Sequence, residues 1–157
     1  MTEENLNVKE IYRRICLQLG PVSAEGSLEA FEFIRHFCGL KKEQVIAGQG
    51  ELSEKGLKDL WEAVSRRALG YPLQYLLGEW EFYGRTFTVG PGVLIPRADT
   101  ETLVESVLSW AFERQGIRMA DLCSGSGCIA VTLWCELDGA EVSAVENSCL
   151  LYTSIVR

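Results

Sequence analysis

The chain has 157 residues, of which 47% are hydrophobic and 24% are charged, and its formal net charge is -7. This composition is that of a globular protein and excludes disorder over most of the chain. The acidic balance argues against binding to nucleic acid or to an anionic membrane surface, since both require a surplus of Lys and Arg. The polar first ten residues are unlike a signal peptide, and no apolar run approaches the ~20 residues of a membrane span. We therefore expect a cytoplasmic protein whose partner is a protein or a small molecule.

The cysteine pattern argues against a disulfide or zinc framework. None of the six cysteines is in C-x-x-C spacing, and three of them lie in or beside one apolar run around residues 123–135. We expect reduced, mostly buried thiols and no metal site. The single histidine, His36, has acidic residues near it only at predicted surface positions of a helix. A partly exposed helix residue is therefore favoured over a metal ligand or general base.

Apolar residues recur at helical spacing from residue 8 to about residue 70, which predicts a small helical domain. The first helix ends at Gly20 and Pro21, and Ser27 is expected to cap a second helix that stops at Gly39. The residues predicted to face inward are Val8, Ile11, Ile15 and Leu19 in the first helix, and Leu28, Phe31, Ile34 and Cys38 in the second.

A short helical turn is predicted over residues 41–47, and a longer helix is expected to begin after Ser53 and to stop at Gly70. Its predicted inward residues are Leu57, Leu60, Trp61, Val64 and Ala68. Arg66 and Arg67 either compensate the carbonyl groups of the last turn or contact a partner, and the first interpretation is favoured. A domain of ~70 residues has a marginal core, so we expect it to dock against the rest of the chain or a partner.

Residues 79–95 are dense in aromatic and β-branched residues, with turn signals at Tyr83-Gly84 and at residues 90–92. They predict a β-hairpin that bridges two domains. A further helix is expected to begin at Asp99 or Thr100, with acidic residues in its first turn, and to stop at Gly116. Its predicted buried face comprises Leu103, Val104, Val107, Leu108 and Ala111.

The stretch ADLCSGSGCIAV, residues 120–131, joins a predicted buried strand at residues 117–122 to an apolar helix over residues 128–137. Gly125 and Gly127 lie in the turn between them, where unpaired N–H groups at a helix N-terminus can meet a ligand at close range. A second strand over residues 141–145 leads to Glu146, whose carboxylate can accept hydrogen bonds from ribose hydroxyls. The pattern predicts a β-α-β unit of a doubly wound sheet with a nucleotide-type ligand site.

The glycine spacing alone leaves other functions open. Gly125-x-Gly127-x-x-Ala130 also fits the fingerprint of dinucleotide-binding proteins, so a fragment of an NAD-dependent oxidoreductase remains an alternative. The least specific interpretation is that the glycines merely permit a tight turn.

Three separate stretches resemble the family of release factor glutamine methyltransferases, which are class I enzymes dependent on S-adenosylmethionine. They are GYPLQYLLGEWEF at residues 70–82, FTVGPGVLIPRADTETLV at residues 87–104, and ADLCSGSGCIA at residues 120–130. The second contains the family's IPR-x-[DE]-TE-x-LV pattern, and the third is similar to its D-L-G-T-G-S-G-x-I-A loop. The resemblance extends over roughly residues 8–147.

The resemblance implies an α+β protein with a small N-terminal helical bundle, a β-hairpin linker and the first β-α-β part of a Rossmann-like class I methyltransferase domain. We expect the helical domain, which would help to recognise the release factor, at residues 1–75. The linker is expected at residues 76–97 and the first portion of the methyltransferase domain at residues 98–157. We expect a monomer whose partners are peptide chain release factors, with no direct contact to nucleic acid or membrane.

The resemblance also assigns a cofactor site for S-adenosylmethionine. The residues that would surround its methionine moiety are Asp121, Cys123, Ser124, Gly125, Ser126 and Gly127. Glu146 would hold the ribose hydroxyls, although the family more often has Asp there. Cys123 stands where the family loop has its first glycine; this is tolerable if φ is negative, whereas a positive φ would cost ~1 kcal/mol or more.

In the family, an Asn-Pro-Pro-Tyr loop orients the glutamine amide of the substrate. These 157 residues contain no such sequence, so no catalytic residue is assigned. From about residue 147 the chain departs from the family pattern, which predicts a truncated copy with an aberrant tail and very little activity. A non-catalytic module that binds release factors is therefore a third hypothesis. Because two parallel strands cannot bury both faces of a sheet, we expect the last third to be poorly stable alone.

Overall fold

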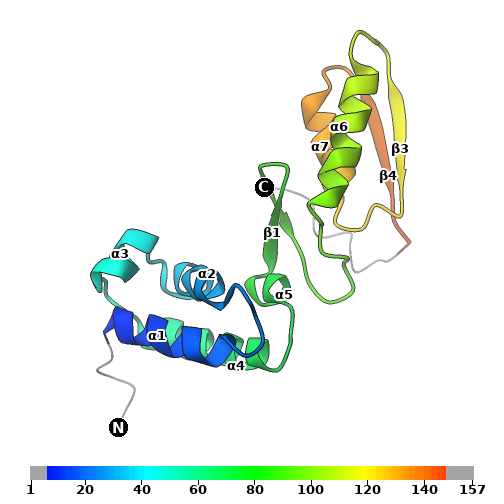
Figure 1. Ribbon diagram of the computed structural model, residues 1–157. Coiled ribbons are helices and arrows are strands. Elements are labelled where there is room, and N and C mark those ends of the chain that lie inside the picture. The colour runs from blue at the N-terminus through cyan, green and yellow to red at the C-terminus, as the bar shows by residue number, and fades with distance from the viewer. Residues whose placement is uncertain (1–6, 148–157) are drawn as a thin grey trace. The chain divides into compact units, whose positions relative to one another are not determined.

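The computed structural model describes residues 7–147, and within them it contains seven helices and two sheets of two strands each (Figure 1). The α+β class, the helical N-terminal part, the hairpin and the β-α-β unit are confirmed. The chain divides into two compact units, Met1–Leu77 and Gly78–Arg157. The predicted aberrant tail lies almost wholly beyond residue 147, outside the described residues.

The first unit is built from helices only. They are α1 (Val8–Leu19), α2 (Gly26–Cys38), α3 (Lys42–Ala47), α4 (Glu54–Ala68) and α5 (Leu73–Leu77). Asn7 caps α1 by accepting a hydrogen bond from the N–H of Glu10, and Ser53 caps α4 in the same way through the N–H of Gly56. Gly39, in the left-handed conformation, ends α2 as predicted. The inward face predicted for the first helix is confirmed, because all four of its residues are buried.

The inward face predicted for α2 is confirmed only in part, because Ile34 is buried but Leu28 is not. Its apolar buried residues are Gly26, Ala30, Phe33 and Ile34, whereas Leu28 is 52% exposed and Phe31 and Cys38 are only half-buried. The helix begins at Gly26, and Glu25, not Ser27, occupies the N-cap position. A Cβ atom at Gly26 would lie 3.3 Å from atoms of Leu19 and Gly20. This close approach of the two chain segments turns the face that carries Gly26, rather than Leu28, toward α1.

The inward face predicted for α4 is confirmed in part. Leu60 and Val64 are buried, whereas Leu57, Trp61 and Ala68 are half-buried. Two small residues, Gly56 and Ala63, complete the buried face. A Cβ atom at Gly56 would lie 2.7 Å from the carbonyl oxygen of Phe37, so glycine allows the start of α4 to approach the end of α2.

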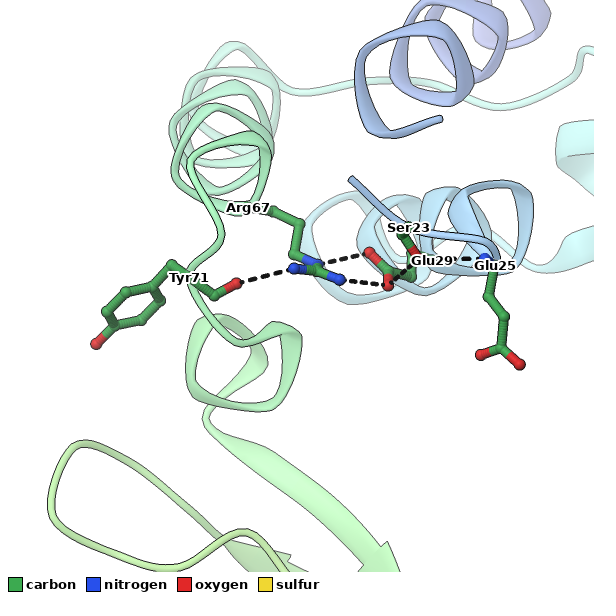
Figure 2. A network of polar contacts seen from close by, with 5 residues as sticks. All are labelled: Ser23, Glu25, Glu29, Arg67 and Tyr71. Carbon is green, nitrogen blue, oxygen red and sulfur yellow. Dashed lines mark hydrogen bonds and ion pairs between the residues drawn. The ribbon is translucent and has the colours of Figure 1, made fainter. Parts of the chain in front are cut away.

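A partly buried polar network joins α2 to α4 (Figure 2). Arg67 donates two hydrogen bonds to the carboxylate of Glu29 and a longer one, at 3.4 Å, to the carbonyl oxygen of Tyr71. Ser23 donates a third bond to Glu29 from the loop before α2, at 2.7 Å. The sequence predicted that Arg67 either compensates the carbonyl groups of the last helical turn or contacts a partner protein. Neither role included this ion pair, because Glu29 is 38 positions away in the sequence. The guanidinium of Arg66 instead lies over the ring of Tyr71, 4.2 Å from its centroid.

The second unit begins with the predicted hairpin. Strands β1 (Glu79–Phe82) and β2 (Arg85–Thr88) are antiparallel, and the two turn residues, Tyr83 and Gly84, both have positive φ. Phe82 and Phe87 point inward and meet edge to face, with ring centroids 6.2 Å apart. The carboxylate of Glu101 accepts a hydrogen bond from the N–H of Tyr83 at 2.8 Å, which ties the turn to the next helix.

That helix, α6 (Asp99–Ala111), starts where the sequence predicts but ends before Phe112, not at Gly116. Residues 113–115 are Glu, Arg and Gln, so a longer helix would gain no apolar burial. Val104 and Ala111 are buried as predicted, Val107 and Leu108 are half-buried, and Leu103 is 50% exposed. The main core cluster of this unit comprises Phe82, Phe87, Val104, Cys128 and Leu133.

The β-α-β unit consists of β3 (Arg118–Leu122), α7 (Cys128–Glu136) and β4 (Glu141–Val145). The strands are parallel, with Arg118 opposite Glu141 and Leu122 opposite Val145. Both α6 and α7 lie on the same side of this sheet (Figure 1). The prediction of a buried strand is wrong: Met119 is half-buried, but Leu122 is 70% exposed, because no element among the described residues covers the other face.

The prediction that most of the cysteines are buried is wrong for the described residues. The five cysteines within residues 7–147 are free, but Cys128 alone is buried, and Cys123 and Cys135 are exposed. Cys149 lies outside the described residues. No helix in residues 7–147 has both the length and the apolar character needed to cross a lipid bilayer.

Candidate functional site

The candidate site is the loop from Cys123 to Gly127, which connects the end of β3 to the start of α7. The backbone turns sharply here because three of its residues have positive φ: 61° at Cys123, 56° at Gly125 and 75° at Gly127. Gly127 is the N-cap of α7 and offers no side chain to the helix N-terminus. A Cβ atom added at Gly125 would meet nothing within 4 Å. The loop therefore presents open backbone beside a helix N-terminus, as a closely approaching ligand requires.

Asp121, the fourth residue of β3, caps α7 from outside the helix. Its Oδ2 atom accepts a hydrogen bond from the N–H of Ala130 at 3.2 Å, which satisfies one of the free donors in the first turn. Burial raises the pKa of Asp121; the bond from Ala130 opposes this shift, and the negative charge of Glu146 adds to it. Two carboxylates that repel each other at the end of a sheet favour a ligand that brings positive charge or hydroxyl donors.

Glu146 lies directly after β4 and reaches back to the loop. Because β3 and β4 are parallel and in register at Leu122 and Val145, both strands end at the same edge. Oε2 of Glu146 accepts a hydrogen bond from the N–H of Gly125 at 2.8 Å, and the N–H of Ser124 donates to the carbonyl oxygen of Val145 at 3.1 Å. The end of the second strand therefore holds the loop through one side-chain bond and one backbone bond.

All seven residues predicted for the cofactor site lie together at this edge of the sheet. Ser126 is buried, Cys123 is exposed, and the other five are half-buried. Sequence reasoning selected Glu146 by its position after the second strand, but missed its bond to Gly125. It also missed the bond between Asp121 and Ala130. The available signal for the second bond was a carboxylate near the end of a strand, two residues before a glycine-containing loop that leads to a helix N-terminus.

The structure shows which sign φ has at Cys123, where the family loop has its first glycine. Its φ is positive, so the conformation is one that residues with a Cβ atom adopt only at a cost of ~1–2 kcal/mol. Its thiol is exposed, whereas burial raises the pKa of the neighbouring Cys128 thiol. The loop therefore carries local backbone strain at the residue that departs from the family pattern.

An apolar cavity of about 510 Å³ lies next to the loop. Its lining comes from α6, β3, α7 and β4 and comprises Leu103, Val107, Met119, Ala120, Asp121, Leu122, Ile129, Leu133 and Val142. Of the seven predicted site residues, only Asp121 contributes to it. The cavity and the glycine loop are therefore adjacent but distinct features.

The described residues offer no alternative site for a metal. Within residues 7–147, no group of three or more His, Cys, Asp or Glu side chains is placed to hold a metal ion. His36 is exposed on α2 in the first unit, where its ring meets that of Phe37 edge to face at 4.7 Å.

Comparison with known proteins places this chain among named relatives. Residues 10–78 match the family described as the PrmC N-terminal domain. A release factor glutamine methyltransferase from Moorella thermoacetica is 42% identical over 122 residues, which is 77% of this chain and 43% of the relative. The protein of the same name from Coxiella burnetii is 36% identical over 146 residues, which is 91% of this chain and 52% of the relative.

A third protein of that name, from Koribacter versatilis, is 49% identical over 87 residues, which is 55% of this chain and 31% of the relative. The chain thus spans about half the length, or less, of the curated relatives it matches. The Coxiella match covers nearly the whole chain, and its identity exceeds what chance similarity produces. By these matches, the chain belongs to the release factor glutamine methyltransferase family.

Proposed function

We propose that this chain carries the cofactor half-site of an enzyme that methylates a glutamine side chain in peptide chain release factors with S-adenosylmethionine. The observation that carries the proposal is the geometry at the end of β3 and β4. A glycine turn opens beside the N-terminus of α7, and the Glu146 carboxylate lies against that turn. The names of the relatives supply the reaction class.

The residues of the loop fit this cofactor in shape and charge. No atom lies within 4 Å of the position of a Cβ at Gly125, so a ligand can approach the backbone there. In the proposal, Glu146 accepts hydrogen bonds from the ribose hydroxyls. Residues 121 and 123–127 surround the methionine moiety, and the carboxylates of Asp121 and Glu146 favour its positive charge. When bound, the cofactor supplies an electrophilic methyl group on a sulfonium ion.

The substrate side of the reaction demands precise positioning. A glutamine amide nitrogen is a weak nucleophile because its lone pair is delocalised into the carbonyl group. Alignment of the two reacting groups can contribute ~7–11 kcal/mol when the geometry is close to that of attack. The residues that the family resemblance assigns to this task are not among the 157 of this chain. We propose that the helical unit, which matches the PrmC N-terminal domain, contributes to binding the release factor.

Calorimetric titration of the purified chain tests the cofactor assignment. S-adenosylhomocysteine is the probe, NADH is titrated in parallel, and the Glu146→Gln variant is compared with a matched control, Asp138→Asn. Asp138 is exposed and follows α7 at the end away from the loop. We expect a binding heat from S-adenosylhomocysteine and none from NADH. Glu146→Gln should lower the affinity for S-adenosylhomocysteine at least about fivefold, whereas Asp138→Asn should leave it unchanged. Binding of NADH alone would instead identify a dinucleotide site and overturn the proposal.

Binding of the protein substrate is tested separately by pull-down with a purified release factor at micromolar concentrations. Retention of the factor on the immobilised chain is the expected result. Failure to retain the factor, by a chain that still binds S-adenosylhomocysteine, would remove the release factor from the proposal and leave the cofactor assignment standing.

A further inference from the structure

The loop from Cys123 to Gly127 is strained at only one of its three left-handed positions. Gly125 and Gly127 adopt positive φ at no steric cost, because they have no Cβ atom. Cys123 has φ of 61° and does have a Cβ atom, so its left-handed conformation is disfavoured relative to other conformations. Interactions elsewhere must therefore keep Cys123 in the turn.

Those interactions are made by the two residues that follow Cys123. The N–H of Ser124 donates to the carbonyl oxygen of Val145 at 3.1 Å, a backbone bond that does not depend on side-chain identity. The N–H of Gly125 donates to Oε2 of Glu146 at 2.8 Å, a bond to a charged acceptor that depends entirely on that side chain. Shortening the side chain at the end of β4 acts directly on the second of these bonds and leaves the donor and acceptor atoms of the first in place.

We propose that Glu146 is a positioning residue for the loop: its carboxylate holds the Gly125 N–H and thereby keeps Cys123 in its left-handed conformation. This inference rests on the proposed function, in which the same loop surrounds the cofactor. Residues 123 and 146 are then energetically coupled, although they are far apart in the sequence. The side-chain length of glutamate matters here, because an aspartate places its carboxylate one methylene farther from Gly125.

A double-mutant cycle in the full chain measures this coupling. The four proteins are the wild type, Cys123→Gly, Glu146→Asp and the double variant. One readout is amide hydrogen exchange at Gly125, measured by NMR without ligand, and the other is the affinity for S-adenosylhomocysteine. In the wild-type background, we expect Glu146→Asp to lower both the protection of the Gly125 amide and the affinity for S-adenosylhomocysteine about fivefold or more. In the Cys123→Gly background, the same substitution should lower each of them less than about twofold. Equal losses in both backgrounds would overturn the inference.

Two further variants separate the positioning role from effects of the thiol and of the negative charge. Cys123→Ala keeps a Cβ atom and removes the thiol, so the full sensitivity to Glu146→Asp should persist; its loss would assign the effect to the thiol and contradict the proposal. Glu146→Gln keeps the length and one acceptor oxygen but removes the charge. We expect it to retain the protection of Gly125 better than Glu146→Asp does. A larger loss of Gly125 protection in the unliganded protein with Gln than with Asp would make charge, not side-chain length, the cause, and would reject the positioning role.

The two readouts also distinguish this inference from the proposed function. If the wild type binds no S-adenosylhomocysteine, the cofactor assignment fails, yet the exchange measurements on the unliganded variants still test the coupling. If the ligand binds but the two substitutions change the free energy of exchange at Gly125 additively, the cofactor assignment stands and the positioning role is rejected.

Discussion

Arg67 and Glu29, separated by 38 positions in the sequence, form a two-pronged ion pair in the first unit, with Nε to Oε2 at 2.7 Å and Nη2 to Oε1 at 2.9 Å (Figure 2). The side chain of Glu29 is 10% exposed and that of Arg67 is 16% exposed. The pair joins the first turn of α2 to the last turn of α4. The additional bond from Arg67 to the carbonyl oxygen of Tyr71 extends this connection toward α5.

Removing one partner of this pair should destabilise the first unit strongly. Arg67→Met leaves a carboxylate buried without its cation, which costs ~3 kcal/mol in comparable pairs. Hydrogen exchange measured on peptides from α2 and α4 would report the loss. The matched control is Arg35→Met, since Arg35 pairs with Glu32 on the surface and should contribute under about 0.5 kcal/mol. Adding Glu29→Leu to Arg67→Met should recover part of the loss; a double variant less stable than either single one would contradict the stabilising role of the pair.

The stability of the first unit should fall in acid because of Glu29. Burial by itself would raise the pKa of this carboxyl, but the hydrogen bonds from Arg67 and Ser23 outweigh burial and lower the pKa below the ordinary value of 4.5. The unfolded chain therefore takes up the proton first as the pH falls. The stabilisation is complete above pH 4.5 and is lost as the pH falls through the lowered native pKa. Urea unfolding across this range, compared between wild type and Glu29→Gln, should show the difference; parallel pH profiles would exclude Glu29 as the cause.

Asp121 in the second unit should show the opposite pH dependence. Its pKa is raised above the ordinary value of 3.8, mainly by burial, so the native state binds the proton more tightly than the unfolded chain. Its contribution is therefore favourable below pH 3.8 and is lost as the pH rises through the raised native pKa. Site-resolved NMR titration of the carboxyl carbons of Glu29 and Asp121 should show shifts of opposite sign. Shifts in the same direction would contradict at least one assignment.

Asp121→Asn should separate capping from charge. The amide oxygen of asparagine can still accept the bond from the N–H of Ala130, and the repulsion from Glu146 disappears, so the second unit should gain stability at neutral pH. Asp121→Ala removes the acceptor and should cost about 1 kcal/mol, as loss of other helix caps does. Thermal unfolding of each variant, together with hydrogen exchange at the amides of α7, measures both changes in stability. Equal destabilisation by Asn and Ala would show that the carboxylate charge, not the hydrogen bond, stabilises the helix.

Cys123→Gly should stabilise the second unit. Glycine relieves the strain of the left-handed conformation, but it also gives the unfolded chain more backbone entropy. The net gain in the free energy of unfolding should be about 0.5–1 kcal/mol. Glu113→Gly, at another exposed residue with positive φ, should act in the same direction. Ser126→Gly, in the same loop but at a residue without positive φ, should destabilise the second unit. Chemical denaturation of the three variants and the wild type measures these differences in the free energy of unfolding. A destabilising Cys123→Gly would mean that the thiol contributes more than the strain costs.

Local patterns in the sequence were sufficient to predict most elements. The four-residue apolar stripe of α1, the glycine stop of α2, the Tyr83-Gly84 turn and the parallel β-α-β unit follow from short-range rules that act within a few residues. The failures arose where a neighbouring part of the chain decided the outcome. Gly26 fits against the end of α1 and so sets which face of α2 is buried, and the exposure of Leu122 depends on what covers the sheet.

For the candidate site, the sequence by itself determined which residues gather there, because a glycine turn after one strand and an acid after the next must meet when the strands are parallel and in register. Only the tertiary structure decided how they contact one another. The bond from Gly125 to Glu146 depends on a distance between residues far apart in the chain, as does the pairing of Glu29 with Arg67 in the first unit, and the positive φ of Cys123 was visible only in the folded loop. Hydrogen bonds and ion pairs are sensitive to tenths of an ångström, and no periodicity in a sequence specifies a distance that finely.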